Sequence, residues 1–117
     1  MSMLEIGDAM VLLVPGEGHP IGTEQDALDL IGETYGQEID LIAVPLSRLH
    51  PDFLKLRSGI AGGFLQKMQN YGQRIAIVGD ISAEVSASKA LHDFVYESNK
   101  VGRVLFVATM DDLSDRL

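Results

Sequence analysis

The sequence predicts an α/β fold in a single domain, residues 1–117, and three observations support this class. Short, nearly continuous apolar runs alternate with longer segments in which apolar residues recur at helical spacing. Gly, Pro and Asp residues that favour turns separate the two kinds of segment. The composition, with 46% hydrophobic and 22% charged residues, is ordinary for a globular domain, and the chain is long enough to bury a core.

The first part of the chain predicts two strands and a helix. The run LEIGDAMVLLVP predicts two strands joined by a tight hairpin at Gly7-Asp8, and the Pro- and Gly-rich PGEGHPIG that follows predicts a loop. Thr23 then has the position of a helix N-cap, with Asp26 as its reciprocal capping partner. Gly36 is a natural end for this helix.

The rest of the chain alternates strands with helices. IDLIAVP, RIAIVGD and RVLFVAT are apolar enough to be strands buried on both faces. Helices are predicted from Ser58, from about Ser86 to Asn99, and from Thr109, which caps the last one. The order is therefore β-β-α-β-α-β-α-β-α. Strands joined through helices run parallel, and the opening hairpin adds an antiparallel edge, so we expect a mixed central sheet flanked by helices.

Charge is unevenly distributed over a net value of −8. Residues 1–47 contain nine acids and no Lys or Arg, residues 48–74 have a net charge of +4, and residues 75–117 have a net charge of −3. An acidic protein lacks the broad basic face that nucleic acids or anionic membranes require, so we expect neither as a partner. The basic segment fits a small anion or an acidic protein, or consists of solvated charges along a helix.

The composition argues against several kinds of site. There are no cysteines, and the three histidines have none of the spacings of a zinc site, so we expect no metal and no cofactor. The absence of cysteine also suits a reducing compartment. No apolar run is long enough to span a bilayer, and no secretory signal is visible at the N-terminus, so we expect a cytoplasmic protein.

The segment RSGIAGG raises the question of a phosphate-binding loop. It lacks the Gly-Lys-Ser/Thr ending of a Walker loop and the G-x-G-x-x-G spacing of a dinucleotide fingerprint. Gly59, Gly62 and Gly63 would share one face of a helix, which predicts close packing of that helix on the sheet, with Ser58 as the N-cap. The alternative is an anion held at this helix terminus beside Lys55 and Arg57.

Three stretches carry a family resemblance. DALDLIG, PDFLKLRSGIAGGFLQKMQNYGQRIAIVGD and LHDFVYESNK resemble the bacterial family called domain of unknown function 4180, over roughly residues 24–100. The resemblance implies no established activity. The strand order is also similar to that of STAS domains, named for sulfate transporters and anti-sigma-factor antagonists. That second resemblance implies an interaction module, but the phosphorylated-serine motif of those antagonists matches here only at Ser58 and Gly59.

Candidate ligand-facing residues lie where the parallel strands end. Ligands of open parallel sheets bind outside the carboxyl ends of the strands. The residues expected near this edge are His50, Lys55, Arg57, Ser58, Gly59, Asp80, Ser82 and Thr109. Asp80 could contact a ligand or act as a base with His50, but an Asp after a strand more often caps a turn.

These observations lead to two main hypotheses. The first is a non-catalytic STAS-like module that acts through protein–protein interaction or self-association, because no catalytic motif is present and the apolar opening strand favours a homodimer. The second is a module that binds or senses a small anionic or lipid-like ligand at the ends of the strands. An enzyme is third, since its only candidate pair is His50 with Asp80.

Overall fold

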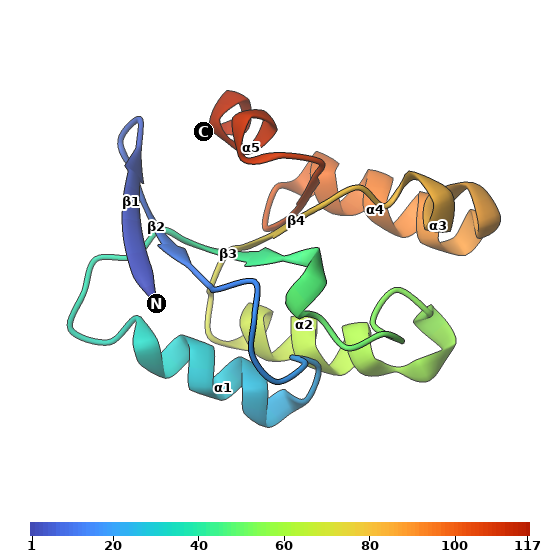
Figure 1. The fold of residues 1–117 in the computed structure, drawn as a ribbon, viewed down its shortest axis with the longest axis horizontal. Coiled ribbons are helices and arrows are strands. Elements are labelled where there is room, and N and C mark those ends of the chain that lie inside the picture. The colour runs from blue at the N-terminus through green and yellow to red at the C-terminus, as the bar shows by residue number, and fades with distance from the viewer.

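A five-stranded sheet, with its strands in sequential order, forms the centre of the computed structural model, which describes residues 1–117 (Figure 1). The strands are β1 (Ser2–Ile6), β2 (Ala9–Leu13), β3 (Leu41–Pro45), β4 (Ile75–Val78) and β5 (Val104–Val107). β1 pairs antiparallel with β2, and all the other neighbours are parallel. The predicted mixed sheet and the predicted hairpin are therefore confirmed.

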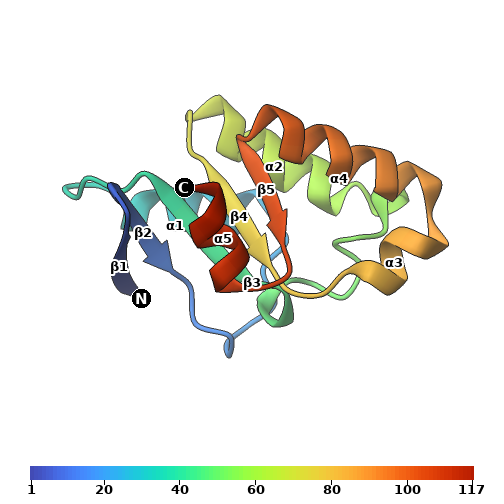
Figure 2. The ribbon, with the colours of Figure 1, turned by 90° about the horizontal axis from the view of Figure 1, so that it is seen from above.

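The helices cover the two faces of the sheet unequally. The three long ones, α1 (Glu24–Glu33), α2 (Ile60–Asn70) and α4 (Lys89–Val101), pack on one face, and α5 (Met110–Arg116) lies on the other (Figures 1 and 2). Right-handed crossovers between strands in sequential order put their helices on one side, which explains this arrangement. The larger core cluster accordingly lies under α1 and α2, and the smaller one surrounds Leu113 of α5.

Local sequence signals account for two of the helix starts. The Thr23 hydroxyl accepts a hydrogen bond from the Asp26 N–H at 3.0 Å, and the Asp26 carboxylate accepts one from the Thr23 N–H at 3.0 Å. The Thr109 hydroxyl accepts one from the Asp112 N–H at 3.1 Å. Both predicted caps are thus confirmed. No helix of the structure has the length and apolar character needed to cross a membrane.

The helix predicted from about Ser86 to Asn99 is in fact two helices. A short helix α3 (Ser82–Ala87) ends before Ser88, whose backbone is extended (φ −139°, ψ 111°). α4 starts after it, because the Ser88 hydroxyl accepts a hydrogen bond from the Leu91 N–H at 3.1 Å and caps the new helix. The periodicity of apolar residues did not reveal this break, since a serine is compatible both with a helix interior and with a cap.

The predicted role of the three glycines at the start of α2, which was close packing of this helix on the sheet, was wrong. Gly59, not Ser58, is the N-cap, and its left-handed backbone (φ 77°) favours glycine. A Cβ added at Gly62 would meet no atom within 4 Å, and one at Gly63 would only touch the Glu24 side chain of α1. None of the three glycines therefore brings α2 close to the sheet.

Candidate functional site

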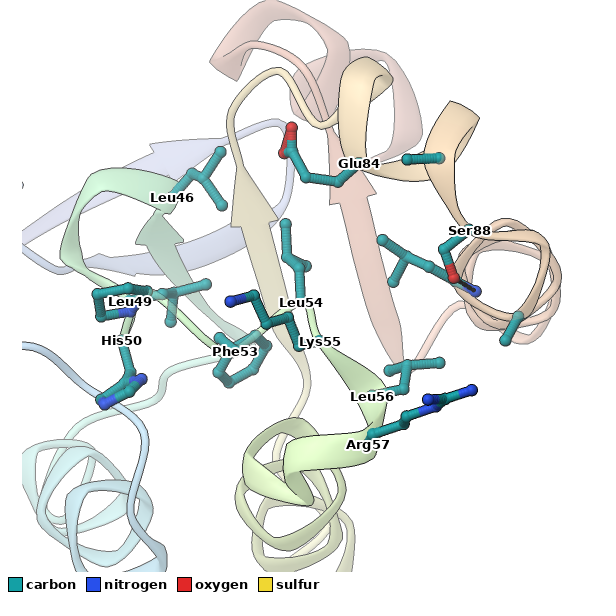
Figure 3. A pocket seen from close by; sticks show the side chains of 14 residues that line it. Leu46, Leu49, His50, Phe53, Leu54, Lys55, Leu56, Arg57, Glu84 and Ser88 are labelled. Carbon is teal, nitrogen blue, oxygen red and sulfur yellow. Dashed lines mark hydrogen bonds between the residues drawn. The ribbon is translucent and has the colours of Figure 1, made fainter.

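A cavity of about 790 Å³ lies beyond the carboxyl ends of β3 and β4 (Figure 3). The segment 46–57 forms one wall, and α3 with the start of α4 forms the other. Eight of the 14 lining residues are hydrophobic: Leu46, Leu49, Phe53, Leu54, Leu56, Ala87, Ala90 and Leu91. Small-molecule sites are concave, mostly apolar and of similar volume, so this cavity is the candidate functional site.

The wall formed by residues 46–57 is irregular but well anchored. The 3₁₀ turns η1 (Leu46–Arg48) and η2 (Leu56–Ser58) flank it, and between them the ring of Phe53 packs edge-on against Phe64 of α2 at 5.6 Å. Phe53 is 1% exposed, so this segment contributes to the core even though it contains no regular helix. The aromatic pair therefore holds the cavity wall against α2.

Arg48 fixes the same wall from its other side. Its side chain is buried and donates hydrogen bonds to the carbonyls of Pro15 and Glu17 at 3.0 and 3.1 Å and to that of His19 at 2.8 Å. The sequence-based interpretation of the basic segment as solvated charges is thus wrong at Arg48. This arginine ties the loop after β2 to the segment after β3.

Gly79 allows β4 to end close to the cavity wall. A Cβ at this position would lie 2.5 Å from the Cβ of Leu46, and the backbone φ is 159°. Any larger residue would therefore displace Leu46, which lines the cavity. The glycine of RIAIVGD thus has a packing role that the sequence did not reveal.

The cations of the basic segment differ in how they are paired. Lys55 forms an ion pair with Asp52 at 3.0 Å, and Lys67 approaches Glu24 at 4.0 Å. Arg74 donates two hydrogen bonds to the Gly102 carbonyl. Arg57, which lines the cavity, has neither an ion pair nor a hydrogen bond within the chain. Its guanidinium is therefore the cation most available to a ligand.

Two more polar residues line the facing wall. Glu84 of α3 is half-buried and has no partner within the chain, and Ser88 is the cap of α4. Figure 3 places Glu84 at the opposite end of the cavity from Arg57. The sequence does not single out these two residues, or Ala87 and Ala90, because the expected ligand-facing positions are the strand ends and not the helix that follows β4.

The structure brings together only some of the predicted ligand-facing residues. His50, Lys55 and Arg57 line the cavity. The His50 Nδ1 accepts a hydrogen bond from the Asp52 N–H at 3.0 Å, so a neutral ring carries its proton on Nε2.

The other five predicted residues lie outside the cavity lining. The Ser58 hydroxyl donates to the Asp52 carbonyl at 3.0 Å, and Gly59 is the N-cap of α2. The Asp80 carboxylate accepts a hydrogen bond from the Ser82 N–H at 2.9 Å, and the Thr109 hydroxyl caps α5. These residues organise turns and helix ends, which confirms the interpretation of Asp80 as a turn cap.

The shifted pKa values occur in other parts of the molecule. The N–H and the hydroxyl of Ser82 hold the pKa of the Asp80 carboxyl below its usual value. Hydrogen bonds from Lys89 and His92 do the same for Asp93 on α4. No group of three or more His, Cys, Asp and Glu side chains is arranged to hold a metal ion.

Comparison with known proteins identifies one family. A family model described as "Domain of unknown function (DUF4180)" matches residues 6–117. No curated protein and no solved structure matches the chain, so the similarity to STAS domains remains a prediction. The family match spans the whole sheet from the end of β1 onward, including every residue of the cavity. The chain therefore belongs to the DUF4180 family, whose function is not established.

Proposed function

We propose that the protein binds a small amphipathic anion, with an apolar body and a carboxylate- or phosphate-sized head, in the cavity between residues 46–57 and α3–α4. The observation that carries this proposal is the combination of an apolar cavity of about 790 Å³ with one cation, Arg57, that has no partner within the chain. The leucine and alanine side chains of the two walls would cover the apolar body.

Arg57 has the chemistry needed to select the head group. A guanidinium presents several N–H donors in a fork that fits a carboxylate or a phosphate. Lys55 lies on the same side of the cavity, but its ammonium group is already paired with Asp52. We therefore expect Arg57 to contribute most of the charge selectivity and Lys55 to add a smaller, screened contribution.

A binding role is also favoured over a catalytic one. Asp80, which was the candidate base, is engaged with Ser82 and lies outside the cavity lining. The ring of His50 accepts a hydrogen bond only from the Asp52 N–H, so it has no acidic partner. The interaction role of a STAS-like module, which the strand order supports, is independent of this cavity.

The test is calorimetric titration with decanoate, with 1-decanol and inorganic phosphate as partial probes. Decanoate should bind most tightly, because it alone has both the apolar chain and the anionic head. Arg57→Gln should weaken decanoate binding at least tenfold and leave decanol binding nearly unchanged. Lys100→Gln, which neutralises an exposed cation outside the cavity, is the matched control and should have no effect on either probe.

A second variant separates the cavity from the rest of the surface. Ala90→Trp places a large ring at an exposed position of the cavity wall and should reduce the binding of decanoate and decanol together. If decanoate binds equally to the native protein, Arg57→Gln and Ala90→Trp, this cavity is not the ligand site. Absence of decanoate binding to the native protein would contradict the proposed ligand class.

A further inference from the structure

The two edges of the sheet are unlike. On the β5 edge, the side-chain amide of Asn99 accepts a hydrogen bond from the Phe106 N–H and donates one to the Phe106 carbonyl. Phe94 of α4 also packs edge-on against Phe106 at 6.0 Å. No element covers the other edge, which is formed by β1. An uncovered edge strand is a template for another strand.

The hydrogen-bonding groups that β1 leaves free can be assigned from its neighbour. The Met10 carbonyl of β2 accepts a hydrogen bond from the N–H of Asp40, which lies beside β3. The Val14 N–H, just past the end of β2, donates one to the Ala43 carbonyl of β3. The alternation of a strand then directs the N–H and carbonyl of Leu4 toward its partner Val11 in β2. The main-chain groups of Met3 and Glu5 consequently point outward, away from the sheet.

The same edge has exposed apolar side chains. Met3 is 52% exposed and Leu4 is 43% exposed, on opposite faces of β1. Met1, next to the strand, is 54% exposed, and the remaining large exposed hydrophobic residues are distributed along the chain from Tyr35 to Leu117. β1 therefore combines unpaired backbone groups with apolar surface on both of its faces.

We propose that a second copy of this chain pairs with β1, so that two β1 strands run antiparallel about a twofold axis at Leu4. Met3 of each copy then lies opposite Glu5 of the other, and four main-chain hydrogen bonds form between them. The two Leu4 side chains meet on the face that carries α5. The result is a continuous sheet across both copies.

Charge disfavours the neighbouring register that is centred on Glu5. A register centred on Glu5 would place two carboxylates directly opposite each other, which is unfavourable. Centring on Leu4 places each Glu5 carboxylate opposite the neutral Met3 of the other copy. β1 lies on the opposite side of the molecule from α3 and the start of α4 (Figure 2), which form one wall of the cavity, so the dimer leaves the cavity open. The inference does not depend on the proposed ligand.

The acidity of the protein gives the association a defined salt dependence. Each copy has a net charge of −8, and residues 1–47 have no Lys or Arg to offset their nine acids. Bringing two such surfaces together costs electrostatic energy that salt screens. The dimer should therefore become stronger, not weaker, as the salt concentration increases.

The first test is sedimentation equilibrium over a range of protein and salt concentrations. The native chain should form a dimer that 0.5 M NaCl strengthens, and Met3→Pro should shift it to the monomer. Proline at this position removes an N–H that points outward and so breaks no bond within the chain. Tyr96→Ser, which removes a 62% exposed ring from α4, is the control and should leave the dimer intact.

The second test reads the register directly and does not depend on the folding of the proline variant. The chain has no cysteine, so Leu4→Cys introduces a single thiol that faces its own copy across the twofold axis. Opposed residues of such a pair are close enough for a disulfide, and a mild oxidant should cross-link Leu4→Cys at least tenfold faster than Tyr96→Cys. Equal cross-linking rates, or a native chain that stays monomeric at every concentration and salt, would overturn the inference.

Discussion

The side-chain amide of Asn99 pairs with the main chain of Phe106 as a neighbouring strand would. It accepts a hydrogen bond from the Phe106 N–H at 2.7 Å and donates one to the Phe106 carbonyl at 3.2 Å. Asn99, a residue of α4, thus forms hydrogen bonds with the backbone groups that face outward at the middle of β5. The two edges of the sheet differ for this reason, and only β1 is left open to another chain.

Removing that pairing should destabilise the fold. Asn99→Ala leaves a part-buried N–H and carbonyl without partners and should lower the free energy of unfolding by about 1–3 kcal/mol. Asn99→Asp keeps the acceptor but places a carboxylate oxygen against the Phe106 carbonyl in place of the donor, so it should destabilise the fold at least as much as Asn99→Ala. Urea denaturation measures both, with His92→Ala on the exposed face of α4 as the control. Equal stability of all the variants would show that the two Asn99–Phe106 hydrogen bonds contribute nothing to stability.

Arg48 should be among the most sensitive positions outside the apolar core. Arg48→Met leaves three carbonyl groups around the loop after β2 without their donor, and the unfolding free energy should fall by about 3 kcal/mol. Arg48→Lys should recover only part of this, since an ammonium group lacks the fork in which Nη1 reaches Pro15 and Glu17 while Nε reaches His19. Arg103→Met loses one exposed hydrogen bond, to Gly72, and should cost under about 1 kcal/mol.

Asp26 should make the protein sensitive to acid. Burial alone would raise the pKa of its carboxyl, but the Gly22 and Thr23 N–H groups, the Thr23 hydroxyl and the His19 ring outweigh this and lower the pKa from 3.8 to about 2. A pKa that is lower in the folded state stabilises the fold above the unfolded value, and this contribution is lost as the pH falls from about 4 to 2.

The corresponding variant is Asp26→Asn. Because the Asp26 side chain is only 14% exposed, we expect a contribution of about 2 kcal/mol at neutral pH. The variant should therefore be less stable than the native chain at pH 7 and approach it below pH 3. Asp29→Asn, on the exposed face of α1, is the control, and a constant difference at all pH values would contradict the assignment.

The two glycines at the start of α2 should respond in opposite directions. Gly62→Ala adds a methyl group where no atom lies within 4 Å and should stabilise the protein by about 0.5–1 kcal/mol through helix propensity. Gly59→Ala forces a Cβ into a left-handed backbone and should destabilise it by about 1–2 kcal/mol. Thermal unfolding compares the two. A loss of stability in Gly62→Ala would instead indicate that close packing of α2 requires glycine at this position.

Much of the local structure could be predicted because its causes lie within a few residues of one another. The Thr23–Asp26 capping box, the Thr109 cap and the Gly7-Asp8 hairpin each depend on contacts along a single turn of chain. The apolar runs identified all five strands, and the predicted helices between the last four indicated that these run parallel. The family match over residues 6–117 agrees with the resemblance seen in the sequence.

The site could be predicted only in part. His50, Lys55 and Arg57 follow the end of β3, where the rule for parallel sheets directs attention. Glu84, Ser88 and the alanines of α3 and α4 carry no such signal. Their place in the cavity depends on the break between two helices that periodicity does not reveal.

What the sequence alone determined is the α/β class, the succession of strands and helices along the chain and the acidic first half, since composition and short-range patterns specify these. Tertiary structure decided which charges are free and which are buried. Arg48 and Arg57 look alike in the chain, yet Arg48 reaches a carbonyl 33 positions away, whereas Arg57 has no partner. The cavity and the two unlike sheet edges likewise arise where segments distant in the sequence meet. At such places long-range geometry, not local preference, decides which polar groups are hydrogen-bonded.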